Sequence, residues 1–305
     1  MSKNLKGNLI LLLAAALWGF AFVAQDIAAG QLGPFSILAV RSFIGAFALS
    51  ILCFFVSLKT KKRVIPESKK DKKSLFIAGL VCGLCLCLAS GLQQIAMAMY
   101  PSDAAVPARS GFITALYVVL VPICSVIFMR ARFSLNILLG IVLAVVGLYF
   151  LCFSGGIGGV YGGDIVMLAC ALSFTAHIMC VDNIGRGVDG IKLSCIQFFV
   201  CGITATILAL IFENTTVSQI ITALPSLLYL GVFSSGIAYT CQIIGQQYSE
   251  NSTVASIVMS LESVFAAIGG AVFGDFLSAR ELLGCTIMFI AIIVSQLPSV
   301  KLKKN

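Results

Sequence analysis

Apolar segments of about 20 residues recur along the whole chain of 305 residues. A helix of that length crosses roughly 30 Å of hydrocarbon, the thickness of a bilayer core. Backbone polar groups in lipid must be satisfied within their own segment, and long unbroken runs exclude the short alternating strands of a membrane barrel. The sequence predicts an all-α polytopic membrane protein with ten transmembrane helices. They are expected near residues 7–28, 34–57, 75–98, 104–129, 134–153, 163–182, 190–212, 222–246, 252–273 and 280–298.

Composition supports lipid as the main surroundings of the protein. Hydrophobic residues make up 60% of the chain and charged residues 10%, whereas soluble domains carry about 25% charged residues. Lys3 and Lys6 precede the first apolar segment, as in a signal peptide, but no small-residue cleavage site follows it. We therefore interpret this segment as a retained first span.

The basic residues predict how the spans are oriented. With ten spans, seventeen of the twenty Lys and Arg residues fall on one side, eight of them in the loop 58–73. The other side keeps Arg280 and, close to the membrane, Arg41 and Arg109. By the positive-inside rule, both termini are expected in the cytoplasm of a multi-pass plasma-membrane protein. The net charge of +8 then reflects topology and contact with anionic lipid, and no nucleic-acid partner is expected.

One helical hairpin occurs twice in the chain. The stretch from Ala15 to Gln25 returns 156 residues later, so that Trp18 corresponds to Phe174 and Arg41 to Gln197. This similarity predicts two halves, residues 1–153 and 163–305, joined by the glycine-rich residues 154–162. Each half holds five expected spans. Because five is odd, the second half must enter the membrane from the opposite side, which predicts two inverted five-helix repeats.

All twelve cysteines lie within the apolar segments. Cys82 and Cys85 have the spacing of a metal or redox pair, but they lack a charged or histidine neighbour. Cysteine is also a small and readily buried hydrophobic residue. Packing is therefore the favoured interpretation, and we expect no metal site, disulfide framework or cofactor.

Short motifs in both halves resemble one family of membrane proteins. Ala-Leu-Trp-Gly at 16–19, Arg41 early in the second span and the run 111–122 are similar to the EamA branch of the drug/metabolite transporter superfamily. The runs 254–256 and 261–267 and Leu283-Gly284 share this resemblance, which covers residues 8–297. The family commonly has Gly-Glu where Gly274-Asp275 stands, and tryptophan where Phe174 stands. The resemblance implies a ten-helix inverted repeat around a central cavity that opens alternately to each side, usually for export, and it implies no particular substrate.

Three ionisable residues inside the expected spans are functional candidates, since such residues are costly in a membrane. Arg41 either pairs with backbone carbonyls or Asp26, or contacts an anion at the cavity mouth. Glu262, near the middle of the ninth span, either bonds a neighbouring helix or serves as a carboxylate for coupling or for a substrate amine. His177 is the only histidine, and it either packs through a hydrogen bond or carries a proton.

Polar and aromatic side chains within the spans complete the candidate pathway, although each could equally serve helix packing. The pathway candidates are Trp18, Arg41, Gln93, Gln94, Tyr117, Phe174, His177, Gln197, Tyr239, Gln242 and Gln246; the coupling candidates are Glu262 and His177. Pro107 and Pro122 are expected to kink the fourth span, and the glycines at 269–270 the ninth.

These observations favour a secondary carrier that exports a small polar metabolite or amino-acid-like compound by alternating access. The chain has no GxxxxGK[ST] motif for binding ATP. The expected partners are a small-molecule substrate, membrane lipid and possible protons, with the protein acting as a monomer or homodimer. A lipid flippase is the alternative, and it would need a cleft that opens sideways to lipid. An intramembrane enzyme is disfavoured, because one histidine and one deep carboxylate on distant spans do not form a catalytic cluster.

Overall fold

The computed structural model describes residues 3–60, 68–101, 104–129, 135–152, 160–248 and 252–296. Residues 154–159 of the glycine-rich joint lie outside these ranges, as do the basic residues at 61–63, 130, 132, 301, 303 and 304, so the predictions made on them concern undescribed residues. Within the described ranges the secondary structure is entirely helical. The elements are α1 (Lys3–Ala29), α2 (Pro34–Thr60), α3 (Lys69–Ala98), α4 (Val106–Thr114), α5 (Tyr117–Met129), α6 (Leu135–Cys152), α7 (Gly162–Ile184), α8 (Gly190–Phe212), α9 (Val217–Thr222), α10 (Leu224–Leu228), the π-helical η2 (Tyr229–Ala238), α11 (Tyr239–Tyr248), α12 (Ser252–Ser260), α13 (Glu262–Val272) and α14 (Ala279–Gln296).

Helical structure covers each of the ten segments that the sequence predicts, and the prediction of a polytopic all-helical protein is confirmed. Among the described residues, seven helices or consecutive helices are long and apolar enough to cross a membrane, and two shorter apolar stretches, Leu138–Gly147 and Val258–Val272, lie in α6 and in α12–α13. The short helix α9 was not predicted. It begins with a capping box, in which Thr216 accepts from the Gln219 amide and the Gln219 side chain accepts from the Thr216 amide.

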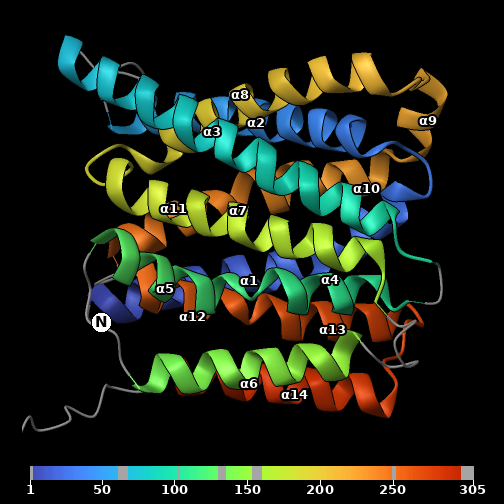
Figure 1. The fold of residues 1–305 in the computed structure, drawn as a ribbon. Helices are drawn as coiled ribbons and strands as arrows, with labels where there is room; N and C mark the ends of the chain where they lie inside the picture. The colour runs from blue at the N-terminus through green and yellow to red at the C-terminus, as the bar shows by residue number, and fades with distance from the viewer. Residues whose placement is uncertain are drawn as a thin grey trace, which may run out of the picture.

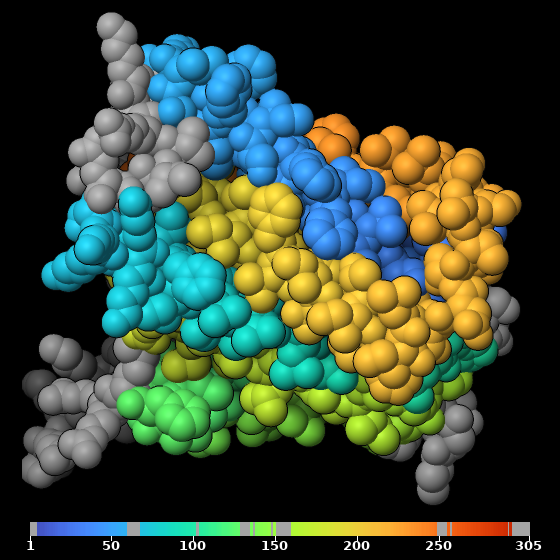
Figure 2. Space-filling model, turned by 90° about the horizontal axis from the view of Figure 1, so that it is seen from above, coloured from blue at the N-terminus to red at the C-terminus, as the bar shows by residue number. Residues whose placement is uncertain are grey.

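The helices run side by side in one bundle (Figure 1). The pair α6 and α14 forms one edge, and α2, α3 and α8 form the opposite face, which Figure 2 shows from above with α9 at one corner. Phe47 on α2, Leu88 on α3 and Ile207 on α8 are more than half exposed on their helices. Exposed apolar side chains of this size on every face-forming helix are suited to contact with lipid.

We call the end of the bundle where α1 begins the N-terminal end, and the opposite end the α9 end (Figure 1). Helices of the first half pack mainly on helices of the second. α2 contacts α8, α3 contacts α7 and α8, α1 contacts α11 and α13, and α6 contacts α14. The two halves therefore share a single interior, and any site at the centre is built from both.

Glycine allows one of these contacts to be very close. A Cβ placed on Gly19 would lie 2.2 Å from the Phe265 Cβ, so α1 and α13 meet at backbone distance there. Small residues at helix crossings permit such an approach in membrane proteins. Gly19 thus packs α1 against α13, whereas the neighbouring Trp18 points into the interior of the bundle.

The fourth and ninth expected spans are each broken into two helices, but not where the sequence suggested. The first break lies at residues 115–116, and the amides of Val118 and Val119 bond carbonyls three residues earlier. Pro122 follows within one turn of these amides. In a regular helix its ring would clash with the Val118 carbonyl. Pro107 does not kink the span, because it lies in the first turn of α4, where no bond is lost. The second break lies at Leu261, and the helix runs unbroken through the glycines at 269–270.

Candidate functional site

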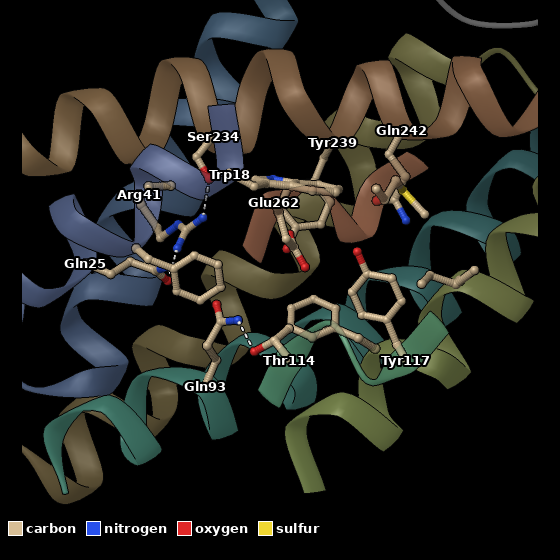
Figure 3. Close-up of a pocket in the computed structure, with 15 residues that line it drawn as sticks. Trp18, Gln25, Arg41, Gln93, Thr114, Tyr117, Ser234, Tyr239, Gln242 and Glu262 are labelled. Carbon is tan, nitrogen blue, oxygen red and sulfur yellow. Dashed lines mark hydrogen bonds between the residues drawn. The ribbon is translucent and has the colours of Figure 1, made fainter. Parts of the chain in front are cut away.

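A cavity lies at the centre of the bundle, and about 440 Å³ of space that no atom fills, part of it open to solvent, lies among its lining side chains. Figure 3 shows that these side chains converge from helices of both halves. The lining residues are Trp18, Ala21, Phe22, Gln25, Arg41, Gln93, Thr114, Tyr117, Phe174, Ile178, Ser234, Tyr239, Gln242, Met259 and Glu262. The lining is therefore about half aromatic and apolar and half polar, and a small-molecule site uses the first for contact area and the second for orientation and specificity.

Aromatic rings form much of the wall. Trp18 and Tyr239 meet edge to face with their centroids 4.7 Å apart, and Phe198 supports Tyr239 from behind at 5.2 Å. The indole Nε1 of Trp18 is buried and has no hydrogen-bond partner among the described residues. It is a donor that a molecule inside the cavity could satisfy.

Arg41 occupies one side of the cavity and is 4% exposed. Its guanidinium donates to Gln25 Oε1 at 2.8 Å and to Ser234 Oγ at 2.9 Å (Figure 3). It also donates to Ser235 Oγ at 3.2 Å. The two serines are adjacent in sequence, and both belong to η2. π-Helical turns of this kind occur often at functional sites. Arg41 does not pair with Asp26, one of the partners considered from the sequence; its partners are neutral side chains.

Glu262 points into the middle of the cavity (Figure 3) and is 4% exposed. It is the first residue of α13, so the break at Leu261 places its side chain at the start of a new helix. Oε1 of Glu262 has no hydrogen-bond partner in the part of the chain that the structure describes. The neighbouring Ser263 hydroxyl donates to the backbone oxygen of Ser260.

Polar groups also mark the other walls of the cavity. Gln93 donates to the Thr114 hydroxyl at 3.3 Å, and Thr114 in turn faces the Met167 sulfur. Gln242 lies across the cavity from Arg41 (Figure 3), and its Oε1 is buried without a partner among the described residues. Of the predicted pathway residues, the cavity is lined by Trp18, Arg41, Gln93, Tyr117, Phe174, Tyr239 and Gln242, and by Glu262 of the coupling candidates.

The remaining candidates are buried but do not line the cavity. His177 Nε2 lies 3.2 Å from Gln197 Oε1, and the His177 ring contacts the Tyr239 ring at 6.1 Å, so it stands behind the cavity wall. Gln246 approaches the Ile178 carbonyl at 3.5 Å, and both amide atoms of Gln94 are without partners among the described residues. These residues form the layer that supports the wall.

Sequence reasoning missed four polar cavity neighbours: Gln25, Thr114, Ser234 and Ser235. Serine and threonine inside a span usually bond their own helix or a neighbour, so their presence carries little information. Two consecutive serines, Ser234 and Ser235, stand between Gly231 and Gly236 in an otherwise apolar segment. This pattern was the one sequence feature that could have indicated polar cavity residues in this span.

A second polar cluster closes the α9 end of the bundle. Arg109 on α4 donates from Nε and Nη2 to the two carboxylate oxygens of Asp164 on α7, each at 2.7 Å, and its Nη1 lies 3.7 Å from Glu281 on α14. The Tyr100 hydroxyl also donates to Asp164, at 2.9 Å, and the guanidinium lies over the Tyr161 ring at 4.7 Å. Sequence reasoning did not identify this cluster.

Comparisons with known proteins identify relatives of this sequence and this fold. Residues 5–153 and 161–296 match the model of the EamA-like transporter family. An uncharacterized transporter from Archaeoglobus fulgidus is 31% identical over 296 residues, which cover 97% of this chain and 87% of that protein. A crystal structure of another protein has the same fold, with a TM-score of 0.71 at 18% identity, and covers 98% of this chain and 99% of its own.

Proposed function

Because the chain belongs to the EamA-like transporter family, we propose that this membrane transporter is a secondary carrier that exports a small polar or amino-acid-like metabolite. The observation that carries the proposal is the central cavity, where Arg41 and Glu262 project from opposite halves among aromatic walls. A carrier needs such a site between two bodies that can rock against each other.

We further propose that the ten helical segments all cross the membrane as two inverted five-helix repeats. Helix packing supports this proposal, because the contacts come in pairs that a two-fold operation would exchange. The contact of α3 with α7 has its counterpart in that of α11 with α1, and the contact of α3 with α8 in that of η2 with α2. The same two-fold operation would exchange α2 with α8 and α6 with α14, so it maps each of these two contacts onto itself.

The N-terminal end is proposed to face the cytoplasm of a plasma membrane, on the strength of the basic loops. In this state the α9 end is closed by the Arg109–Asp164 ion pair and by Glu213, which accepts hydrogen bonds from the Phe35 and Ser36 amides. Each of these links joins the first half to the second. Breaking them would open the cavity toward the α9 end, which is the release step of an exporter.

A flippase is the weaker alternative. An apolar groove does open on the outside of the bundle between α2, α3 and α8, lined by residues such as Leu88, Gly91 and Leu208. It shares no lining residue with the central cavity. A flippase must guide a polar headgroup from such a lateral opening into a polar interior, and the groove has Thr204 as its one polar lining side chain.

Counterflow in proteoliposomes tests the proposed function. Wild-type protein should exchange at least one labelled compound from a panel of amino acids, amines, carboxylic acids and sugars without ATP. Ala21→Phe fills the cavity, because Ala21 lines it and is 1% exposed, and should abolish exchange. Ile165→Phe is the matched control, since Ile165 is 66% exposed on α7 and should leave exchange unchanged. Equal exchange by both variants would contradict transport through this cavity.

A further inference from the structure

We propose that the substrate is a small zwitterion, with one carboxylate held by Arg41 and one ammonium group held by Glu262. The inference rests on the proposed function, because it assigns a substrate class to the same cavity. It follows from the charges of the cavity and from what is missing around each of them.

Arg41 is a buried cation whose hydrogen-bond partners are all neutral. Three N–H groups of its guanidinium donate to Gln25, Ser234 and Ser235, and a guanidinium has five such groups. No Asp or Glu of the described residues lies within ion-pair distance of it. A buried charge without a counter-ion is costly. The planar guanidinium matches a carboxylate in shape and charge, so an entering carboxylate would complete the site.

Glu262 presents the opposite requirement. Its carboxyl group is buried at the cavity surface, and Oε1 has no partner within the described part of the chain. Trp18 and Tyr239 stand beside it in the wall (Figure 3). Aromatic faces attract an ammonium group within about 6 Å of the ring centre, and the attraction grows when water is excluded. A carboxylate among aromatic rings is therefore suited to a substrate amine.

The two charged residues line one cavity yet do not pair with each other. The ion pairs of the described residues include neither of them. In Figure 3, Arg41 and Gln25 lie on one side of the cavity, Glu262 lies at its centre and Gln242 lies on the far side. A molecule with both charges would neutralise both residues at once. A substrate with a single charge would pair with only one of the two residues.

The test compares compounds that differ by one charged group. Wild-type protein in proteoliposomes is assayed by counterflow with L-leucine, with 3-methylbutylamine, which lacks the carboxylate, and with 4-methylpentanoate, which lacks the amine. Glycine, β-alanine and 4-aminobutanoate vary the spacing of the two charges, and glucose serves as an uncharged probe. At least one amino acid should exchange, and the singly charged leucine analogues should exchange about tenfold less than L-leucine or the best amino acid, since a charge-assisted bond is worth that factor or more.

Two variants assign the charges to residues. Arg41→Gln should reduce amino-acid exchange about tenfold or more while sparing the amine, and Glu262→Gln should do the same while sparing the acid. Purely structural roles would lower all substrates in parallel, and a parallel loss would overturn the assignment. Arg186→Gln and Asp189→Asn, which alter charges away from the cavity, are the controls. Each variant must show the wild-type gel-filtration profile.

The outcomes separate this inference from the proposed function. Exchange of a singly charged or uncharged compound without exchange of any amino acid would overturn the zwitterion proposal and leave the carrier intact. No exchange of any compound by well-folded protein would count against both.

Discussion

Arg41 and Arg109 are both buried, and the protein holds them in opposite ways. Arg109 is 1% exposed and makes a two-point contact with Asp164, with Glu281 and two tyrosine rings around it. Arg41 is 4% exposed, and its partners are an amide and two hydroxyl groups. One arginine has its counter-charge built into the fold, whereas the other lines a cavity and has no counter-charge among the described residues.

The difference separates a structural charge from a functional one. Arg109 links α4 to α7 and α14 at the α9 end, and the carboxylates of Asp164 and Glu281 balance its charge without any ligand. Arg41 is held in place by neutral groups, which fix its position without neutralising it. Burial alone does not distinguish the two residues. The identity of the partners does, and this comparison can be tested from both sides.

The largest effect is expected from Asp164→Asn. The substitution leaves Arg109 buried with a neutral partner, and breaking a buried pair in this way costs about 3–5 kcal/mol. The thermal unfolding midpoint in detergent should fall steeply. Asp182→Asn is the matched control: Asp182 is 9% exposed, but the side chain of its partner Arg186 is 45% exposed, so water can solvate the arginine after the substitution and the loss should be smaller.

The same pair offers a second check. Arg109→Met combined with Asp164→Leu and Glu281→Gln removes the charges of the cluster and should recover part of the stability lost by Asp164→Asn, since apolar replacements of buried pairs are often neutral. If Asp164→Asn and Asp182→Asn shift the midpoint equally, Arg109 is not the structural member of the comparison.

A smaller loss of stability is expected from Arg41→Gln. It removes three hydrogen bonds from a charged donor to neutral acceptors, each worth about 1.5–3 kcal/mol, and this loss is offset because it also removes a buried charge that has no counter-ion among the described residues. The midpoint should therefore fall by less than in Asp164→Asn, although exchange of substrate falls sharply. A loss of stability as large as that of Asp164→Asn would make Arg41 structural as well.

Much of the fold could be predicted because lipid imposes a simple rule. A run of about 20 apolar residues must be a helix, and helices are found over every predicted segment. The breaks at 115–116 and at Leu261 could not be placed, because they depend on how neighbouring helices press on the chain. Pro122 signalled a break about two turns from its true position, whereas the glycines at 269–270 signalled one where the helix is continuous.

The candidate site was predictable in part for a related reason. A polar or aromatic residue deep in a span is expected to avoid lipid, and Arg41, Glu262 and Gln242 do reach the cavity. Sequence could not rank them against His177, which is equally buried but lies behind the wall. The Arg109–Asp164 pair was missed because its members are 55 residues apart, and their meeting depends on the packing of α4 against α7.

The next prediction extends the comparison to the acid that shares the cavity with Arg41. If transport is coupled to protons, Glu262→Gln should abolish its dependence on pH, because the amide cannot titrate, whereas His177→Ala should retain it. Tyr117 and Tyr239 line the same cavity as Glu262. A phenol ordinarily loses its proton at about pH 10, far above the pH range of the assay. Exchange rates measured between pH 5.5 and 8.5 check this. An unchanged pH profile in both variants would remove Glu262 and His177 as coupling residues.

The smallest effect concerns Glu213, the second link at the α9 end. Its carboxylate accepts from the Phe35 amide at 2.7 Å and from the Ser36 amide at 2.9 Å, at the start of α2. A negative charge there also stabilises the helix dipole, so Glu213→Gln should cost about 1 kcal/mol. Like Arg109, and unlike Arg41, Glu213 has its partners within the fold. The variant should therefore lower the unfolding midpoint slightly while leaving the preference between amino acid, amine and acid unchanged. A changed preference would mean that links at the α9 end also help to select the substrate.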